Sequence, residues 1–255
     1  MDVCGLNFTA TICDPNLRTV NTGAKCGAED DFYYYSPWRA PGSAGVLDAC
    51  GMAGGTSNAG GYGAQYKTTP HAQQGDLGSE TLKKTESGVT WKAGSKVEVS
   101  WTIQANHGGG YQYRLCPSSE PLTEECFQRM PLPFTGMQSF KWADGVQIFF
   151  NGSYVSEGTH PPGSTWAMNP IPRNDTLQTG KSFPPRCEEV PECGSTEVMS
   201  KCLCSGMWGP YNLQIIDTLQ LPTNLSAGEY VLGWRWDCEE STQIWSSCSD
   251  VTITV

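Results

Sequence analysis

The fold class is decided by the stretch Lys96-Val97-Glu98-Val99-Ser100-Trp101-Thr102-Ile103, in which apolar and polar residues alternate. A period of two places all the apolar side chains on one face of an extended chain, so this stretch predicts a half-buried β-strand. The same alternation returns at residues 111–115, after a three-glycine turn at 108–110. Two such strands joined through a glycine turn favour a β-rich fold.

Further apolar-rich segments at 213–221, 230–236 and 251–255 predict more strands, separated by Gly-, Pro- and Asn-rich breaks. Residues 120–129 have room for one or two helical turns. Short strands with many cysteines predict an all-β fold, an antiparallel β-sandwich with long disulfide-stapled loops. We expect a single domain over 1–255. We expect residues 1–90 to form a loop-rich N-terminal excursion, residues 91–255 to form the sandwich core, and the N-terminus to be truncated.

The composition argues against several classes of protein. The 255 residues include 16 Lys+Arg and 26 Asp+Glu, for a net charge of −10, and 29 Gly and 17 Pro. So many glycines and prolines argue against a bundle of long helices. An acidic chain without basic runs repels phosphates, so we expect no nucleic-acid partner. No apolar run approaches ~20 residues, so we expect no membrane partner.

Twelve cysteines spread along the chain predict up to six disulfides and an oxidising compartment. We expect the pairs Cys116–Cys126 and Cys238–Cys248, because each pair is close in sequence and flanks a turn. Four Asn-x-Ser/Thr sequons support a secreted, extracellular glycoprotein. They begin at Asn7, Asn151, Asn174 and Asn224.

Three histidines are the first candidates for chemistry. His71 and His160 lie in loop-like segments, and we interpret both as exposed loop residues. His107 follows a buried-type strand and precedes three glycines. Its ring either caps the strand or is presented to a ligand, since the glycines would leave its surroundings open. Both interpretations stand at this point.

Gln243 and Trp245 are the next candidates. They are two residues apart, so on an extended chain both point to one face and Ile244 points to the other. An amide beside an indole can form the wall of a polar–aromatic site. Ordinary sandwich packing explains the same pattern equally well.

Two classes of hydrolase are disfavoured. The chain has no Gly-x-Ser-x-Gly elbow for a serine nucleophile. The adjacent acidic pairs at 124–125 and 239–240 would point to opposite faces of a strand, which does not suit a glycosidase pair. We interpret these four carboxylates as solvated charge.

Several motifs stand in a fixed order: Cys50-Gly51, Ala105-Asn106-His107-Gly108, Tyr113-Arg114-Leu115-Cys116-Pro117, Trp234-x-Trp236-Asp237 and Gln243-Ile244-Trp245-Ser246-Ser247-Cys248. This order resembles the lytic polysaccharide monooxygenases, and most closely their insect-type and chitin-binding type-four branches. The resemblance covers roughly residues 38–255. It implies an immunoglobulin- or fibronectin-III-like sandwich, in agreement with the strand pattern.

The resemblance also implies a chemistry. Members of this family bind one copper ion through a mature N-terminal histidine and an internal histidine, and then cleave a chitin- or cellulose-like polysaccharide oxidatively with an external electron donor. His107 matches the internal copper ligand. Trp245 matches the axial aromatic, and because an indole cannot ligate a metal, it would shield that side. Gln243 matches the amide that orients bound oxygen. A monomer is expected.

The chain departs from the family at its start. It begins with Met1, no histidine precedes His71, and no charged-then-apolar leader is present. We expect that the segment carrying the N-terminal histidine is missing and that this chain binds copper weakly. The alternatives are a non-catalytic carbohydrate-binding module and a structural or adhesive secreted protein.

Overall fold

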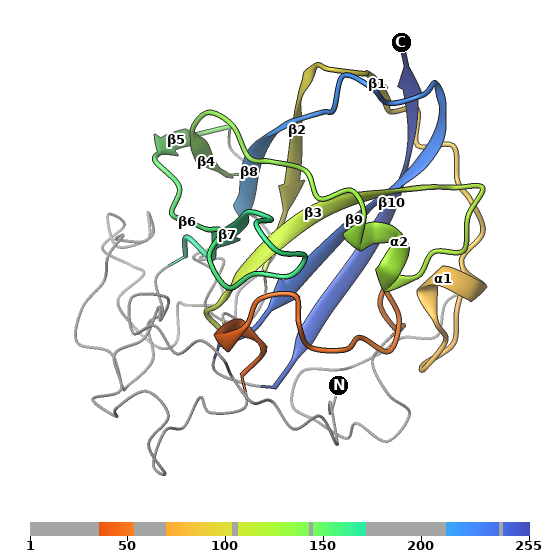
Figure 1. Cartoon of the computed structure of the whole chain (residues 1–255), viewed down its shortest axis with the longest axis horizontal. Coiled ribbons are helices and arrows are strands. Elements are labelled where there is room, and N and C mark those ends of the chain that lie inside the picture. The colour runs from red at the N-terminus through yellow and green to blue at the C-terminus, as the bar shows by residue number, and fades with distance from the viewer. Residues whose placement is uncertain (1–35, 54–69, 104–106, 143–144, 172–212, 240–241) are drawn as a thin grey trace.

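A computed structural model describes residues 36–53, 70–103, 107–142, 145–171, 213–239 and 242–255, which form two β-sheets packed as a sandwich (Figure 1). The predicted all-β sandwich is therefore confirmed, while its immunoglobulin or fibronectin-III type stays a prediction. None of the helices in these ranges has the length and apolar character needed to cross a membrane. In the same ranges, the first strand begins at Thr90.

The larger sheet has the strand order β1-β10-β9-β3-β7-β6, and the smaller has the order β2-β8-β4-β5. Strand β1 pairs with β10 in parallel, and the other pairings are antiparallel. The strands are β1 (Thr90–Lys92), β2 (Lys96–Trp101), β3 (Gly110–Pro117), β4 (Gln138–Trp142), β5 (Gln147–Phe150), β6 (Tyr154–Val155), β7 (Trp166–Met168), β8 (Leu213–Gln220), β9 (Gly228–Asp237) and β10 (Ile244–Thr254). The helices are the 3₁₀ helix η2 (Pro37–Arg39), α1 (Gly78–Thr81) and α2 (Glu124–Gln128).

The long strands lie where the alternation predicts them, and α2 lies within the segment 120–129. The last strand is longer than expected, because β10 begins at Ile244 and not at Val251. Strands β1, β4, β5, β6 and β7 have two to five residues each, which is too short to show a clear period of two.

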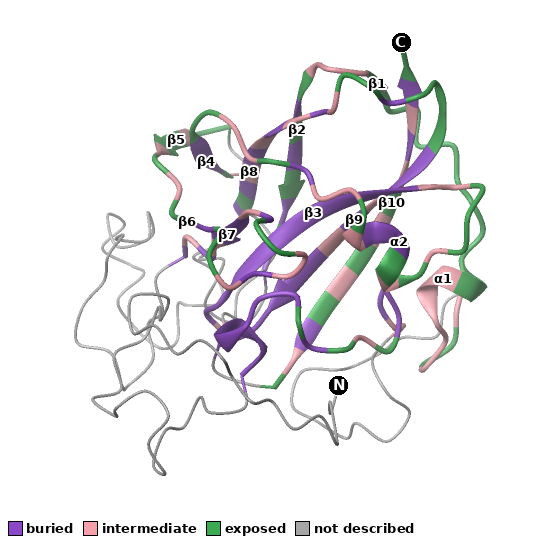
Figure 2. Cartoon of the chain, viewed as in Figure 1, coloured by how far each residue is buried: buried purple, intermediate pink, exposed green. Residues whose placement is uncertain are grey.

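The main core lies between the two sheets. Alternate residues of β8 are buried, as in a strand with one covered face. Strand β3 differs, because it is buried along nearly its whole length, whereas β10 alternates (Figure 2). Both faces of β3 must therefore be covered.

The second cover consists of α2 and the segment 36–50, which cross in front of β9 and β10 (Figure 1). The guanidinium of Arg235 donates to the Asp237 carboxylate at 2.7 Å, to Glu124 at 2.7 Å and to the carbonyl of Ala44 at 2.8 Å. Arg114 donates to the same Glu124 oxygen at 2.5 Å. Both arginines are almost fully buried.

Glu124 is therefore not a solvated charge, and that interpretation is wrong for this residue. Burial acts to raise its pKa, but the guanidinium groups of Arg114 and Arg235 outweigh burial, so the pKa of Glu124 is lowered. The reason is local: residue 124 begins a helix that lies against the sheet, and it does not sit on an exposed strand.

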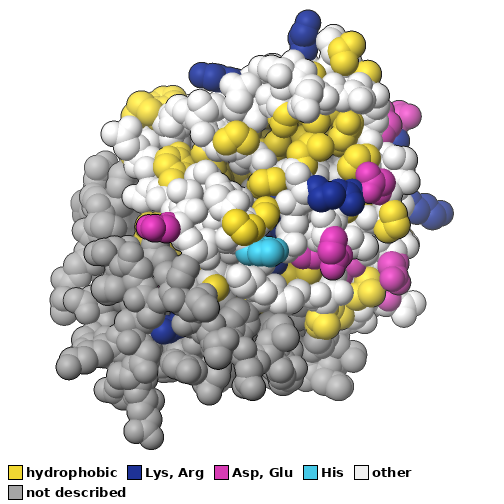
Figure 3. Space-filling view, in the orientation of Figure 1, with side chains coloured by type: hydrophobic (Ala, Val, Ile, Leu, Met, Phe, Trp, Pro, Cys, Tyr) yellow, Lys and Arg dark blue, Asp and Glu magenta, His cyan; other side chains and the backbone are white. Residues whose placement is uncertain are grey.

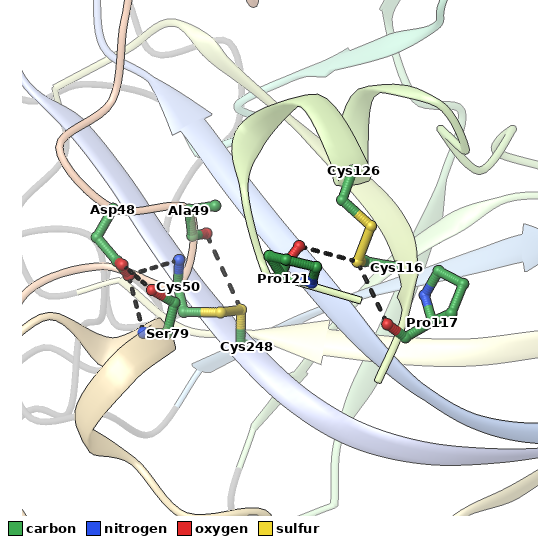
Figure 4. The surroundings of a disulfide bond; sticks show 9 residues. All are labelled: Asp48, Ala49, Cys50, Ser79, Cys116, Pro117, Pro121, Cys126 and Cys248. Atoms are coloured by element: carbon green, nitrogen blue, oxygen red, sulfur yellow. Dashed lines mark hydrogen bonds between the residues drawn. A yellow bond between two sulfur atoms is a disulfide. The ribbon is translucent and has the colours of Figure 1, made fainter. Parts of the chain in front are cut away.

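Two disulfides anchor the outer cover (Figure 4). The predicted Cys116–Cys126 bond is confirmed, with a Cα–Cα distance of 5.5 Å, and it ties α2 to β3. The predicted Cys238–Cys248 bond is wrong, because Cys248 bonds Cys50, with a Cα–Cα distance of 4.9 Å.

The ladder explains the wrong pairing. Cys248 lies opposite Gly233, and the peptide N–H of Cys238 donates to the carbonyl of Gln243. Five residues of strand separate the two positions, which is about 17 Å. The two side chains also lie on opposite faces of the sheet. Cys248 faces the outer cover, while Cys238 lies in the core between the sheets. A disulfide cannot span that separation.

The surface carries dispersed charge. On the face seen in Figure 3, Lys and Arg side chains do not form a continuous patch, and on the α2 side they stand next to Asp and Glu. The ion pair between Arg129 and Glu120 is an example of such an exposed contact. Of the four sequons, Asn151 and Asn224 are exposed, and Asn7 and Asn174 lie outside the described residues.

Candidate functional site

His107 lies just before β3, at one end of the sandwich, and its neighbours hold the chain there. The indole N–H of Trp236 donates to the carbonyl of Gly108 at 2.7 Å. The peptide N–H of Asn169 donates to the carbonyl of Gly109 at 2.8 Å. The segment that carries the His107 ring is therefore fixed against β9 and the chain after β7.

The glycines after His107 are required by close packing. Gly109 has a φ of +72°, and a Cβ there would lie 2.0 Å from the carbonyl oxygen of Asp237. A Cβ at Gly110 would lie 2.3 Å from the indole of Trp38. These glycines are buried. The glycines therefore let the backbone pack closely on its neighbours, and the access of a ligand to the His107 ring stays a prediction.

The ring of His107 is half-buried and stacks on Trp236. The ring centroids are 6.1 Å apart and the planes are inclined by 26°. Trp236 itself is only 4% exposed and belongs to the core between the sheets. A stacked ring on a buried indole has a defined orientation at the molecular surface.

Trp245 lies on β10, the strand that pairs with the end of β9. It is directly opposite Trp236 in the β9–β10 ladder, and opposed residues of an antiparallel pair share a face. Its side chain is 48% exposed. Gln243 precedes β10, and its carbonyl accepts from the N–H of Cys238, so it extends the same ladder. The three predicted site residues, His107, Gln243 and Trp245, therefore all adjoin the end of β9, and their chemical roles stay predictions.

Glu239 also belongs to this end of β9. Its peptide N–H donates to the carbonyl of His107 at 3.1 Å, and the residue is only 1% exposed. The interpretation of Glu239 as solvated charge is wrong. The acidic pair at 239–240 gave no sign of this, because the contact of Glu239 with His107 joins segments that are far apart in the sequence.

A buried polar cluster between the sheets was missed. The carboxylate of Asp217 accepts from the Tyr111 hydroxyl at 2.9 Å, from the Tyr113 hydroxyl at 3.2 Å and from the Gln138 amide at 2.5 Å. Asp217 has the parity of its apolar neighbours Leu213, Ile215 and Leu219 in β8. A charge at an inward position of an alternating strand was the available signal.

The electrostatics of this cluster follow from burial. Burial raises the pKa of Asp217 to about 6, while the hydrogen bonds from Gln138, Tyr111 and Tyr113 limit the rise. Burial and the nearby Asp217 charge raise the pKa of both tyrosines, which keeps their hydroxyls protonated donors.

The other two histidines have different surroundings from one another. His71 is exposed, and a ring nitrogen of His160 lies 3.1 Å from the Gln128 amide oxygen on α2. In the part of the chain that the structure describes, no three His, Cys, Asp or Glu side chains form a group that could hold a metal ion. The copper site that the resemblance implies needs an N-terminal histidine as well as His107. The described residues alone therefore do not complete that site.

No family model matches this chain. It is similar to a solved cellulose-active lytic polysaccharide monooxygenase, CelS2, in complex with copper, with a TM-score of 0.31 and 13% identity over 68% of this chain and 54% of that chain. It is also similar to the C-terminal domain of the Streptococcus pyogenes antigen I/II-family protein AspA, with a TM-score of 0.27 and 10% identity over 66% of this chain and 41% of that chain. The match thus spans about half of each solved chain. At these scores, neither likeness carries an argument about function.

Proposed function

We propose that this protein is secreted and acts as a monomer on an insoluble, chitin- or cellulose-like polysaccharide through the surface of His107, Gln243 and Trp245. We further propose that it cleaves the polysaccharide oxidatively, with an external electron donor, when copper is bound at His107. The observation that carries this proposal is that the half-buried His107 ring stacks on Trp236, while the half-exposed Trp245 is the ladder partner of the same residue.

The polysaccharide part rests on the exposed indole. An aromatic ring with a free face stacks on the apolar face of a sugar ring, and the neighbouring amide of Gln243 offers both a donor and an acceptor to hydroxyl groups. Trp245 has the exposure that this requires, whereas Trp236 does not.

The copper part rests on His107 and on a ligand from outside the described residues. The stacking on Trp236 fixes the direction of the imidazole. The resemblance implies that the remaining nitrogen ligands come from an N-terminal histidine. Trp245 would shield one side of the ion without ligating it, because an indole has an N–H donor and no free lone pair. Copper, when bound, supplies the oxidising chemistry.

Binding to chitin and to cellulose tests the first part. We expect Trp245→Ala to weaken adsorption about tenfold, which corresponds to the loss of about 1.4 kcal/mol of stacking. The matched control is Phe149→Ala, because Phe149 is 60% exposed but lies on β5 in the other sheet. Equal weakening by both variants, or no adsorption by the unaltered protein, would contradict the proposed surface.

Copper titration with electron paramagnetic resonance tests the second part. A form of the protein whose first residue is a histidine should show a tight type-two copper site. His107→Ala should remove that site, and His160→Ala should leave it intact. Weak binding by the histidine-first form would exclude the oxidative enzyme.

A non-catalytic carbohydrate-binding module is the second candidate. It is favoured by the exposed indole of Trp245, which can stack on a sugar ring without a metal ion. Adsorption that depends on Trp245, without tight copper binding by any form of the protein, would select this function.

A further inference from the structure

One of the four sequons directly follows the last strand of the smaller sheet. Strand β5 ends at Phe150, and Asn151-Gly152-Ser153 comes next. Asn151 and Ser153 are both exposed, so the folded protein has room for an oligosaccharide on the Asn151 amide. A Cβ at Gly152 would lie 2.6 Å from the hydroxyl oxygen of Tyr154. The middle of the sequon therefore packs closely on the protein, while the two residues that define it face solvent.

An exposed aromatic ring precedes this asparagine by two residues. Phe149 is 60% exposed. The next residue, Phe150, packs on Phe140 of the core, with ring centroids 4.6 Å apart, so Phe149 points away from the core. The chain runs from β5 to β6 without a turn or a bend. Asn151 therefore lies on the same face as Phe149, about 7 Å further along the chain.

This spacing suits contact between a sugar and the ring. An N-linked oligosaccharide begins with N-acetylglucosamine, whose C–H face stacks on an aromatic ring and removes apolar surface of both from water. A sugar on the Asn151 amide starts beside Phe149 and on the same face. Contact with the ring would restrict the sugar to one side of the strand.

The other described sequon lacks this arrangement. Asn224 is also exposed, but Pro222 has the position that Phe149 has before Asn151. The middle residue of that sequon, Leu225, is buried. Asn224 is therefore an internal control for a sequon without an aromatic partner.

The edge of the smaller sheet supplies a reason for such a cover. Among the described strands, β5 pairs with β4 alone, and Ile148 next to Phe149 is 37% exposed. An apolar edge strand favours pairing with a second chain, and natural proteins commonly cover or block such edges. A sugar held against Phe149 would block this edge.

We propose that Asn151 carries an N-linked oligosaccharide whose first sugar stacks on Phe149 and covers the free edge of β5. A bond forms between the amide nitrogen and the anomeric carbon of the sugar. The bond from that carbon to the diphosphate of a lipid carrier breaks, and the amide loses one proton. The proposal rests on the secretion that the proposed function includes. It needs neither copper nor a polysaccharide substrate, so failure of adsorption at Trp245 leaves it intact.

Peptide mass mapping tests the attachment, with the full chain secreted from a eukaryotic host. An amidase that removes N-linked oligosaccharides converts the modified asparagine to aspartate, and we expect this conversion at Asn151. An unmodified Asn151 would overturn the proposal.

Nuclear magnetic resonance tests the stacking, on protein trimmed to a single N-acetylglucosamine at each site. The ring current of Phe149 should move the proton signals of the Asn151 sugar upfield. Phe149→Ala should abolish this shift, Phe149→Tyr should keep it, and the Asn224 sugar should be unaffected by both. Signals of the Asn151 sugar that are the same with and without the aromatic ring would overturn the stacking.

A double-mutant cycle measures the same contact in urea unfolding. Phe149→Ala should lower the folding equilibrium constant about fivefold more in the trimmed glycoprotein than in Asn151→Gln, which is equivalent to about 1 kcal/mol. The matched control is Leu82→Ala. Leu82 is 53% exposed and lies next to α1, on the opposite side of the view from β5 (Figure 1). It should lose the same stability in both backgrounds, and equal losses for Phe149→Ala would overturn the contact.

Sedimentation velocity tests the cover. Asn151→Gln should form oligomers at concentrations where Asn224→Gln stays monomeric, because only the first variant uncovers β5. Equal self-association of the two variants would overturn the role of the sugar at the sheet edge.

Discussion

The two faces of β3 and β9 are both buried, but one packs aromatic side chains and the other packs ion pairs. Facing the second sheet, Tyr111 and Trp236 pack in an aromatic core. Facing α2 and the segment 36–50, Arg114 and Arg235 are just as buried, and their charges are matched by Glu124 and by the carboxylate at 237. A strand with alternating apolar and polar residues can therefore be buried on both faces when its polar side chains have hydrogen-bonding or ionic partners.

The largest expected effect comes from breaking the ionic face. Arg235→Ala should destabilise the fold by about 3–5 kcal/mol, because it leaves Asp237 buried without its guanidinium partner. The measurement is the free energy of unfolding in urea. Arg129→Ala is the control, since its ion pair with Glu120 is exposed and should contribute about 1 kcal/mol or less. Equal losses from Arg235→Ala and Arg129→Ala would mean that the outer face is not a closed ionic layer.

The alternation in the sequence accounts for the inner face better than for the outer one. Residues 97–103, 111–115 and 230–236 place their apolar positions in the core, as a period of two requires. The outer face needs contacts between distant segments. Nothing local indicates that Glu124 meets Arg235 across 111 residues, or that Cys50 meets Cys248 across 198.

The candidate site, like the fold, could be predicted only in part from the sequence. The position of His107 before the glycines is visible in the sequence, and so is the shared parity of Gln243 and Trp245. The reason for the glycines is not visible, because it lies in the carbonyl of Asp237 from a strand more than a hundred residues away. The Asp217 cluster could have been anticipated from one inward charge, but its tyrosine donors could not, because they come from the other sheet.

The second-largest expected effect is on the pH dependence of stability, which differs between the buried carboxylates of the two faces. The folded state raises the pKa of Asp217 from 3.8 to about 6, so the folded protein holds this proton more tightly than the unfolded chain. The resulting stabilisation is fully present below pH 3.8 and is lost as the pH rises through 6. At about 1.4 kcal/mol per pKa unit, it is at most about 3 kcal/mol. Glu124 has a lowered pKa, so its contribution is lost in the opposite direction, as the pH falls.

Asp217→Asn isolates the inner contribution. As the pH rises from 4 to 7, the free energy of unfolding of the variant should increase by up to about 3 kcal/mol relative to that of the unaltered protein. Denaturant titrations at several pH values measure this difference, whatever the absolute stability of the variant. Parallel pH curves for the two proteins would show that Asp217 does not titrate differently in the folded and unfolded states.

The smallest effect is expected at Trp245, and it tests where the aromatic core ends. Trp245 and Trp236 face each other across one ladder position, yet Trp236 is buried and Trp245 is half-exposed. Trp236→Ala should cost about 3–5 kcal/mol, because it opens a cavity under His107. Trp245→Ala should cost about 1 kcal/mol or less, as expected for a surface side chain. Urea unfolding of both variants checks this. A loss of unfolding free energy at Trp245 as large as that at Trp236 would show that Trp245 is part of the core. Its indole would then lack the exposed face that the proposed polysaccharide surface requires.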